Sequence, residues 1–176
     1  LRLCTPLCNM FGIKYPIIQA GMAGGITSPE LISAVSNAGG LGMLSAAMLS
    51  PEETGEQIRR IKSQTSRPFG VNLLLAPPEQ NGHDASDVQN VLNNFRSELG
   101  LRPSDNTQIN LPESRLSEQI GVILKEKVPI ISFGLGNPRT FAEEIHSHGV
   151  KVIAMVTTVN EAKEVIADGA DVVVAQ

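Results

Sequence analysis

The fold is decided by one stretch of the sequence, Tyr15-Pro-Ile-Ile-Gln-Ala-Gly-Met-Ala-Gly-Gly-Ile-Thr-Ser-Pro-Glu30. Residues 16–20 form a short apolar run of the kind that a parallel sheet buries on both faces. Glycines follow at once, and glycine permits positive φ and a close approach of the backbone to a ligand. Ser28-Pro29-Glu30 then has the order of an N-cap, a first helical residue and a first-turn acid. The stretch therefore predicts a strand, a loop and a helix, with the loop placed where α/β proteins bind ligands.

The same order recurs along the chain. Residues 36–44, 146–154 and 166–174 each end a helix at a glycine and begin a buried strand within two residues. This is the pattern of successive βα units. The strands that it predicts are residues 16–20, 41–46, 69–75, 128–135, 151–156 and 171–176. Six parallel strands fit either an open doubly wound sheet or six-eighths of a (β/α)8 barrel, and periodicity does not separate the two.

Helix starts mark the chain between these strands. Ser50 and Thr158 are each followed three residues later by Glu, which is the pattern of a capping box. Gly39 is the expected left-handed cap of the first long helix. The connection at about 76–127 is longer than the others. In it we expect one helix that is capped by Asp84 or Ser86 and reaches Leu99, and another over 114–127. We expect this connection to place an extra element over one end of the sheet.

Composition excludes several classes of protein. The chain has 176 residues, enough for one good-sized core, and a formal net charge of -4, which gives no reason to expect nucleic acid or an acidic membrane surface as a partner. It contains no apolar run long enough to span a membrane. Cys4 and Cys8 are the only cysteines, and their spacing is not that of a zinc site. We expect two reduced thiols and a cytoplasmic protein.

Few polar residues lie inside the predicted strands. Asn72 lies in Gly-Val-Asn-Leu-Leu, where a buried amide must find a hydrogen bond either from a neighbouring segment or from a ligand. Ser132 lies inside the fourth strand, where a hydroxyl bonded to the backbone is the simpler interpretation. Neither G-x-G-x-x-G nor a Gly-Lys-Ser/Thr loop follows any strand, so no common phosphate-binding motif is present. His146 and His148 lie on a helix and not at a strand end, which disfavours a catalytic role.

Five blocks of sequence together resemble one family. They are residues 12–25, 34–42, 67–73, 128–134 and 169–176, including Gly-Ile-Lys-Tyr-Pro-Ile-Ile-Gln-Ala-Gly-Met at the start and Gly-Ala-Asp-Val-Val-Val-Ala-Gln at the end. In this combination and order the chain resembles the nitronate monooxygenases, formerly called 2-nitropropane dioxygenases, which are FMN-dependent TIM barrels. The resemblance implies a single FMN-binding barrel domain over residues 1–176 that is incomplete at its C-terminal end.

The resemblance also implies roles for particular residues. The backbone of Ala20, Gly21 and Met22 would lie against the flavin ring, Asn72 would hydrogen-bond the flavin from the third strand, and Gln176 would contact it from the sixth. No metal is implied. The implied reaction is the FMN-dependent oxidation of alkyl nitronates by O2 to a carbonyl compound and nitrite. The partners would be a nitronate or nitroalkane and O2, and the family is compatible with a homodimer.

The chain departs from the family at its end. The family's catalytic histidine and its phosphate-binding glycine loops lie beyond the position of Gln176, so no catalytic residue is assigned and we expect the natural protein to be longer. Two alternatives stay open. One is an FMN-dependent enoyl-acyl-carrier-protein reductase, a relative that shares the same blocks loosely. The other is a truncated barrel without catalytic activity.

Overall fold

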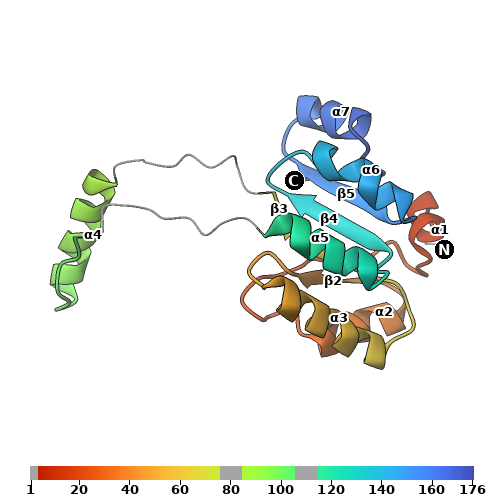
Figure 1. The fold of residues 1–176 in the computed structure, drawn as a ribbon, viewed down its shortest axis with the longest axis horizontal. Helices are drawn as coiled ribbons and strands as arrows, with labels where there is room; N and C mark the ends of the chain where they lie inside the picture. The colour runs from red at the N-terminus through yellow and green to blue at the C-terminus, as the bar shows by residue number, and fades with distance from the viewer. Residues whose placement is uncertain (1–3, 76–84, 106–114) are drawn as a thin grey trace. The chain divides into compact units, whose positions relative to one another are not determined.

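The structure, a computed structural model, describes residues 4–75, 85–105 and 115–176. Contacts divide the chain into a larger unit, residues 1–76 with 115–176, and a smaller unit, residues 77–114. The strands are β1 (Ile18–Gln19), β2 (Leu41–Ser45), β3 (Phe69–Leu74), β4 (Ile130–Gly134), β5 (Lys151–Val156) and β6 (Val172–Ala175). The helices are α1 (Pro6–Phe11), α2 (Pro29–Ala38), α3 (Pro51–Gln64), α4 (Ser86–Glu98), α5 (Leu116–Lys125), α6 (Arg139–Ser147) and α7 (Val159–Ala167) (Figure 1). Within these described ranges, no helix is both long and apolar enough to cross a bilayer.

The larger unit is a sheet of six parallel strands in the order β1-β2-β3-β4-β5-β6. Every strand pairs with the strand before it, and helices α2, α3, α5, α6 and α7 connect or flank them (Figure 1). A doubly wound sheet reverses its strand order at a switch point, and this sheet does not. The consecutive parallel order is that of a singly wound barrel. The predicted first six strands of a TIM barrel are therefore confirmed.

Most predicted helix ends are confirmed. The hydroxyl oxygens of Ser28, Ser50 and Thr158 accept hydrogen bonds from the backbone N–H groups three residues on, at 3.3, 3.1 and 3.2 Å. Gly39 ends α2 with φ of 101°. The predicted cap at Ser86 is wrong, because Ala85 holds the N-cap position and Ser86 is already helical. Asp84 lies outside the described residues.

The strands are shorter than predicted except β5, which has the predicted bounds. β1 is confined to Ile18–Gln19 and β4 to Ile130–Gly134, although the apolar runs extend further in both directions. An apolar run in the sequence therefore does not by itself give ladder pairing or burial, since the residues directly before and after β1 and β4 are exposed.

The two larger apolar clusters lie on the two faces of this sheet. The outer core packs Ile32 of α2, Ile58 and Ile61 of α3, and Ile120 and Ile123 of α5 against strand residues. The inner core packs Cys8 and Phe11 of α1 and the following Ile13 against Leu41, Met43, Ile130 and Ile153. Helix α1 thus covers the inner face beside the first residues of the strands, where no βα helix lies. Both cysteines are unpaired thiols, Cys4 exposed and Cys8 buried.

The smaller unit contains α4. The side chain of Asn93 in α4 makes two hydrogen bonds to the backbone of Ser104. Nδ2 donates to the carbonyl at 3.0 Å, and Oδ1 accepts from the N–H at 2.9 Å. No residue of α4 is buried. The predicted extra helix in the long connection is present, with bounds one residue short of Leu99. The predicted second helix of this connection is α5, which belongs to the larger unit.

Helix α5 ends on a non-glycine residue in the left-handed region. Lys127 has φ of 51°, its N–H bonds the Leu124 carbonyl at 2.9 Å, and the Val128 N–H bonds the Ile123 carbonyl at 3.2 Å. These are the two hydrogen bonds of a Schellman motif, which favours glycine at this position. Replacing Lys127 with glycine is expected to raise the free energy of unfolding by about 1 kcal/mol, because it removes the strain on Cβ.

Chemical denaturation measures this change. The matched control is Lys125→Gly, two residues earlier in the last helical turn. There the same substitution is expected to lower the free energy of unfolding by up to about 1 kcal/mol. Equal effects of the two substitutions would contradict the assigned cap.

Candidate functional site

The inner face of the sheet changes from apolar to polar toward the carboxyl ends of the strands. Strand register places Ser45 opposite Asn72 and Asn72 opposite Ser132. Two residues earlier in each strand, the same face carries Met43, Gly70 and Ile130. The lower layer packs tightly, since a Cβ on Gly70 would lie 2.5 Å from the Met43 sulfur. Ser45, Asn72 and Ser132 thus form a polar row above this apolar layer. The row lies toward the carboxyl ends of the strands, where barrels bind their ligands.

Asn72 is oriented by the neighbouring strand. Its Nδ2 lies 3.3 Å from the hydroxyl oxygen and 3.4 Å from the carbonyl oxygen of Ser132. A main-chain carbonyl only accepts hydrogen bonds, so the amide nitrogen must face Ser132 and the amide oxygen must face the other way. Asn72 thus satisfies part of its hydrogen bonding within the protein and also presents an acceptor.

The glycine loop lies directly against this polar row. A Cβ built on Gly21 would lie 3.1 Å from the Asn72 Cβ and 3.3 Å from the Ser45 Cα. Only a residue without a side chain lets the backbone come this close. The structure therefore brings together Gly21 and Asn72, which the sequence had placed in one site, and Ala20 and Met22 flank Gly21.

Gln176 lies in a different part of the same end of the sheet. It directly follows β6, and β4 and β5 lie between β6 and Asn72. It lines a pocket of about 330 Å³ together with Leu135, Met155 and Thr157. Leu135 is 70% exposed and has φ of 60°, which is unusual for a leucine. The pocket thus combines the side-chain amide of Gln176 with an exposed leucine and a half-buried methionine.

Two carboxylates line this pocket, those of Glu161 and Glu164. The hydrogen bonds of Glu161 determine what it can do there. Its oxygen accepts hydrogen bonds from the Thr157 N–H at 2.7 Å, the Thr157 hydroxyl at 3.0 Å and the Thr158 N–H at 3.1 Å. The backbone and side-chain hydrogen bonds of Thr157 lower the pKa of this carboxyl below its usual range. Glu161 is therefore an ionised helix cap and is not suited to donate a proton.

A second pocket, of about 260 Å³, separates the glycine loop from the β2–α3 loop. Met22, Gly24 and Gly25 line one side of it, and Met48 and Leu49 line the other. Sequence reasoning missed Ser45 and the β2–α3 loop as parts of this region. Ser45 pairs in register with Asn72 and lies on the same face of the sheet, and that shared phase is the signal that could have found it.

His146 lies at the opposite end of the sheet. Its Nε2 is 2.9 Å from Oδ2 of Asp171, which precedes β6, and Lys151 at the start of β5 donates to Oδ1 of the same carboxylate at 2.7 Å. The N–H of Val152 donates to Oδ2 at 2.8 Å. This cluster ties α6 to the first residues of β5 and β6. It has a structural role and is remote from Gln176.

Asp171 is expected to make the stability of the protein depend on pH in acid. Burial alone would raise the pKa of Asp171, but the hydrogen bonds from Lys151, Val152 and His146 lower it. A carboxyl with a lowered folded-state pKa stabilises the fold above its unfolded pKa of about 3.9, and this stabilisation is lost as pH falls through the folded value.

Asp171→Asn should therefore lower the free energy of unfolding by about 1–2 kcal/mol at neutral pH and flatten its decline below about pH 4. Denaturant unfolding across the acid range measures both effects. Glu143→Gln, which removes an exposed carboxylate of α6, is the matched control. An acid limb that is as steep in Asp171→Asn as in the parent protein would contradict the assignment.

Comparison with known proteins agrees with this arrangement. The model of the nitronate monooxygenase family matches residues 5–176. A probable nitronate monooxygenase of Staphylococcus aureus is 34% identical over 174 residues, covering 97% of this chain and 48% of the relative. One of Staphylococcus saprophyticus is 33% identical over 181 residues, covering 100% of this chain and 49% of the relative. The chain thus spans about half the length of the curated relatives it matches.

Two solved structures show the same fold over nearly the whole chain. Nitroalkane oxidase from Streptomyces ansochromogenes superposes with a TM-score of 0.80 at 31% identity, covering 98% of this chain and 48% of that one. FabK from Thermotoga maritima superposes with a TM-score of 0.74 at 29% identity, covering 98% and 43%. On the family match, the full-length alignments and the consecutive parallel sheet, this chain belongs to the nitronate monooxygenase family.

Proposed function

We propose that the whole protein is an FMN-dependent nitronate monooxygenase, which oxidises alkyl nitronates with O2 to a carbonyl compound and nitrite. The observation that carries this proposal is the contact between Gly21 and Asn72 at the carboxyl end of the strands, in a chain of this family. A bare backbone beside an oriented amide fits the edge of a planar heterocycle. The donor and acceptor chemistry of these residues therefore suits a flavin ring.

Individual residues would have distinct tasks in this site. The backbone of Ala20, Gly21 and Met22 would lie along the ring, and the Asn72 amide oxygen would accept a hydrogen bond from it. Gln176 would offer its amide from β6. When bound, FMN supplies the electron-accepting chemistry that no side chain provides. The protein's own part is to orient the reactants and exclude water.

The pocket beside Gln176 supports an alkyl substrate. Leu135 and Met155 give it apolar side chains. Its two lining glutamates, Glu161 and Glu164, would repel the anionic end of a nitronate, so only the alkyl part would lie in this pocket. Leu135 is exposed and held in the left-handed region, and a role in binding would account for this unusual conformation. Its side chain would contact the alkyl part of a nitronate.

The test is oxygen consumption by the whole, flavin-loaded protein with propyl-2-nitronate as the substrate. Turnover with release of nitrite is the expected result. If the loaded protein consumes no O2 with any short alkyl nitronate, the proposal is wrong.

The enoyl reductase alternative predicts that NADH, and not a nitronate, reduces the flavin. An enoyl reductase domain from Bacillus amyloliquefaciens shares the fold with a TM-score of 0.59 at 20% identity, which supports the fold alone. Rapid bleaching of the flavin by NADH, with no turnover of nitronate, would favour this alternative. Flavin binding without either reaction would favour a barrel that lacks catalytic activity.

A further inference from the structure

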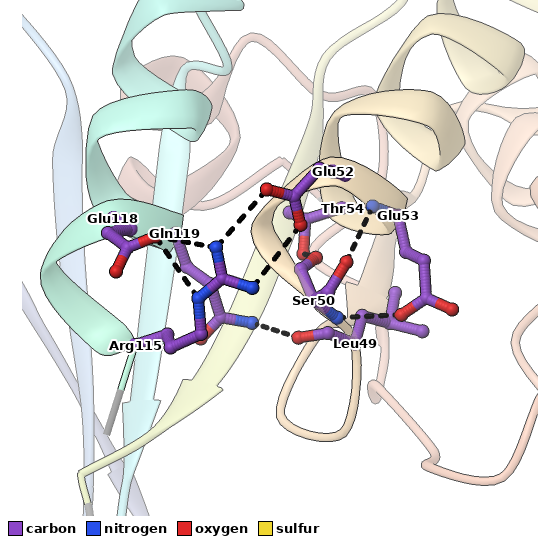
Figure 2. Close-up of polar contacts among 8 residues, drawn as sticks. All are labelled: Leu49, Ser50, Glu52, Glu53, Thr54, Arg115, Glu118 and Gln119. Atoms are coloured by element: carbon purple, nitrogen blue, oxygen red, sulfur yellow. Dashed lines mark hydrogen bonds and ion pairs between the residues drawn. The ribbon is translucent and has the colours of Figure 1, made fainter. Parts of the chain in front are cut away.

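Gln119 joins helix α5 to the loop between β2 and α3. Its side chain is buried, with 7% of the residue exposed, in the first turns of α5. Nε2 donates to the Ala46 carbonyl at 2.8 Å and to the Leu49 carbonyl at 2.7 Å (Figure 2 shows the second of these). Both amide hydrogens are therefore used, and both are given to the same short loop.

This loop supports the polar row and the glycine loop. The Ala46 N–H bonds the Asn72 carbonyl at 2.9 Å, and the Leu49 N–H bonds the Ala46 carbonyl at 3.1 Å. The preceding residue, Ser45, is one of the two residues against which Gly21 packs. Met48 and Leu49 line the second pocket together with Met22. A shift of residues 46–49 would therefore move the surface on which the glycine loop lies.

The neighbouring ion pairs hold the loop much less firmly. Arg115 contacts Glu52 of α3 at 3.1 Å and Glu118 of α5 at 2.7 Å, with nearly half of its side chain exposed (Figure 2). Exposed pairs of this kind contribute about 1 kcal/mol or less. Loss of the Gln119 amide costs more, because the part-buried Leu49 carbonyl loses its donor and the buried Ala46 carbonyl keeps only the Leu49 N–H. The amide of Gln119 is thus the main constraint on residues 46–49 from α5.

We propose that Gln119 is a positioning residue of the flavin site. By holding residues 46–49 it keeps Gly21 against Asn72, and through them it sets the surface that receives the ring. Helix α5 begins at Leu116 in the larger unit, and Gln119 joins its first turns to the site. The inference rests on the proposed function and adds a residue that touches neither cofactor nor substrate.

The test compares three variants of the whole protein. Gln119→Met keeps the side chain's length and removes both donors. Gln119→Glu also lacks donors while ionised, but its protonated form regains one O–H donor. Arg115→Gln removes only the exposed ion pairs and is the control. FMN affinity is measured by quenching of flavin fluorescence from pH 5.5 to 8, with each variant referred to the parent protein at the same pH.

Gln119→Met should weaken FMN binding by about tenfold at every pH. Gln119→Glu should be at least as weak at pH 8 and should recover toward the parent as pH falls, because a buried carboxyl facing two carbonyl oxygens has a raised pKa. The surrounding charges are Glu52 and Glu53 of α3 and Arg115 and Glu118 of α5 (Figure 2). Helix-start hydrogen bonds from its own backbone and Ser50, with Arg115, lower the pKa of Glu52, so Glu52 does not cause this recovery.

Hydrogen–deuterium exchange of the flavin-free protein gives a second readout. Amides in residues 44–50 and 20–25 should exchange about tenfold or more faster in Gln119→Met than in Arg115→Gln. A merely structural role would lower the melting temperature without a pH-dependent recovery in Gln119→Glu. Parent-like FMN affinity in Gln119→Met, or a pH-independent Gln119→Glu, would overturn the inference alone. Failure of the parent protein to bind FMN would overturn the proposed function and the inference with it.

Discussion

Replacing Gly42 with alanine is expected to lower the free energy of unfolding by about 3 kcal/mol or more. Gly42 lies in β2 on the face that packs against α2. A Cβ at this position would lie 2.4 Å from the carbonyl oxygen, 2.8 Å from Cγ2 and 2.9 Å from Cα of Ile32. Two of these three atoms belong to the helix backbone and cannot rotate away. The helix itself would have to move, and it carries the fully buried Ile32 side chain.

Equilibrium denaturation of the whole protein measures this effect. The matched control is Gly121→Ala in α5, where a Cβ would meet no atom within 4 Å. That change should be neutral or stabilise by up to about 1 kcal/mol, because alanine favours helix more than glycine does. A Gly42→Ala protein within about 0.5 kcal/mol of the parent would mean that α2 does not lie this close to β2.

The second large effect concerns ligand binding. Asn72→Leu should weaken FMN binding by about tenfold to a hundredfold, because leucine has a similar size and no acceptor for the ring. It also leaves the Ser132 hydroxyl and carbonyl without the contact from Nδ2. Fluorescence titration of the whole protein with FMN measures the loss.

Asn160→Ala provides the control for Asn72→Leu. Asn160 is an exposed asparagine of α7, and its substitution should leave FMN affinity within about twofold of the parent. Melting temperatures of both variants separate a loss of binding from a loss of folding. An Asn72→Leu protein that folds and binds FMN as tightly as the parent would remove Asn72 from the site.

Local signals in the sequence were sufficient for most of the fold. Ser28, Ser50 and Thr158 cap their helices as predicted. Each hydroxyl bonds an N–H only three residues on, so the interaction depends on local sequence alone. Strand order was different, because helix and strand periodicities are the same in an open sheet and in a barrel. Only the family resemblance separated them before the consecutive order of β1 to β6 was known.

Part of the candidate site could be predicted from the positions of its residues in the predicted strands. Gly21 follows β1 and Asn72 lies in the second half of β3, so parallel pairing brings them toward the same edge of the sheet. Gln119 was not predictable, because its importance depends on where α5 lies against the β2–α3 loop. That contact joins residues 70 or more positions apart in the sequence. A polar residue at the start of an amphipathic helix gives no sign by itself of what it contacts.

The most direct test of the central claim is the visible absorption spectrum of the purified whole protein, recorded before and after mixing with propyl-2-nitronate in the absence of O2. The proposed function predicts a protein-bound flavin spectrum whose long-wavelength band is bleached by the nitronate. A protein that carries no flavin, or a flavin that NADH bleaches and nitronate leaves unchanged, would contradict it.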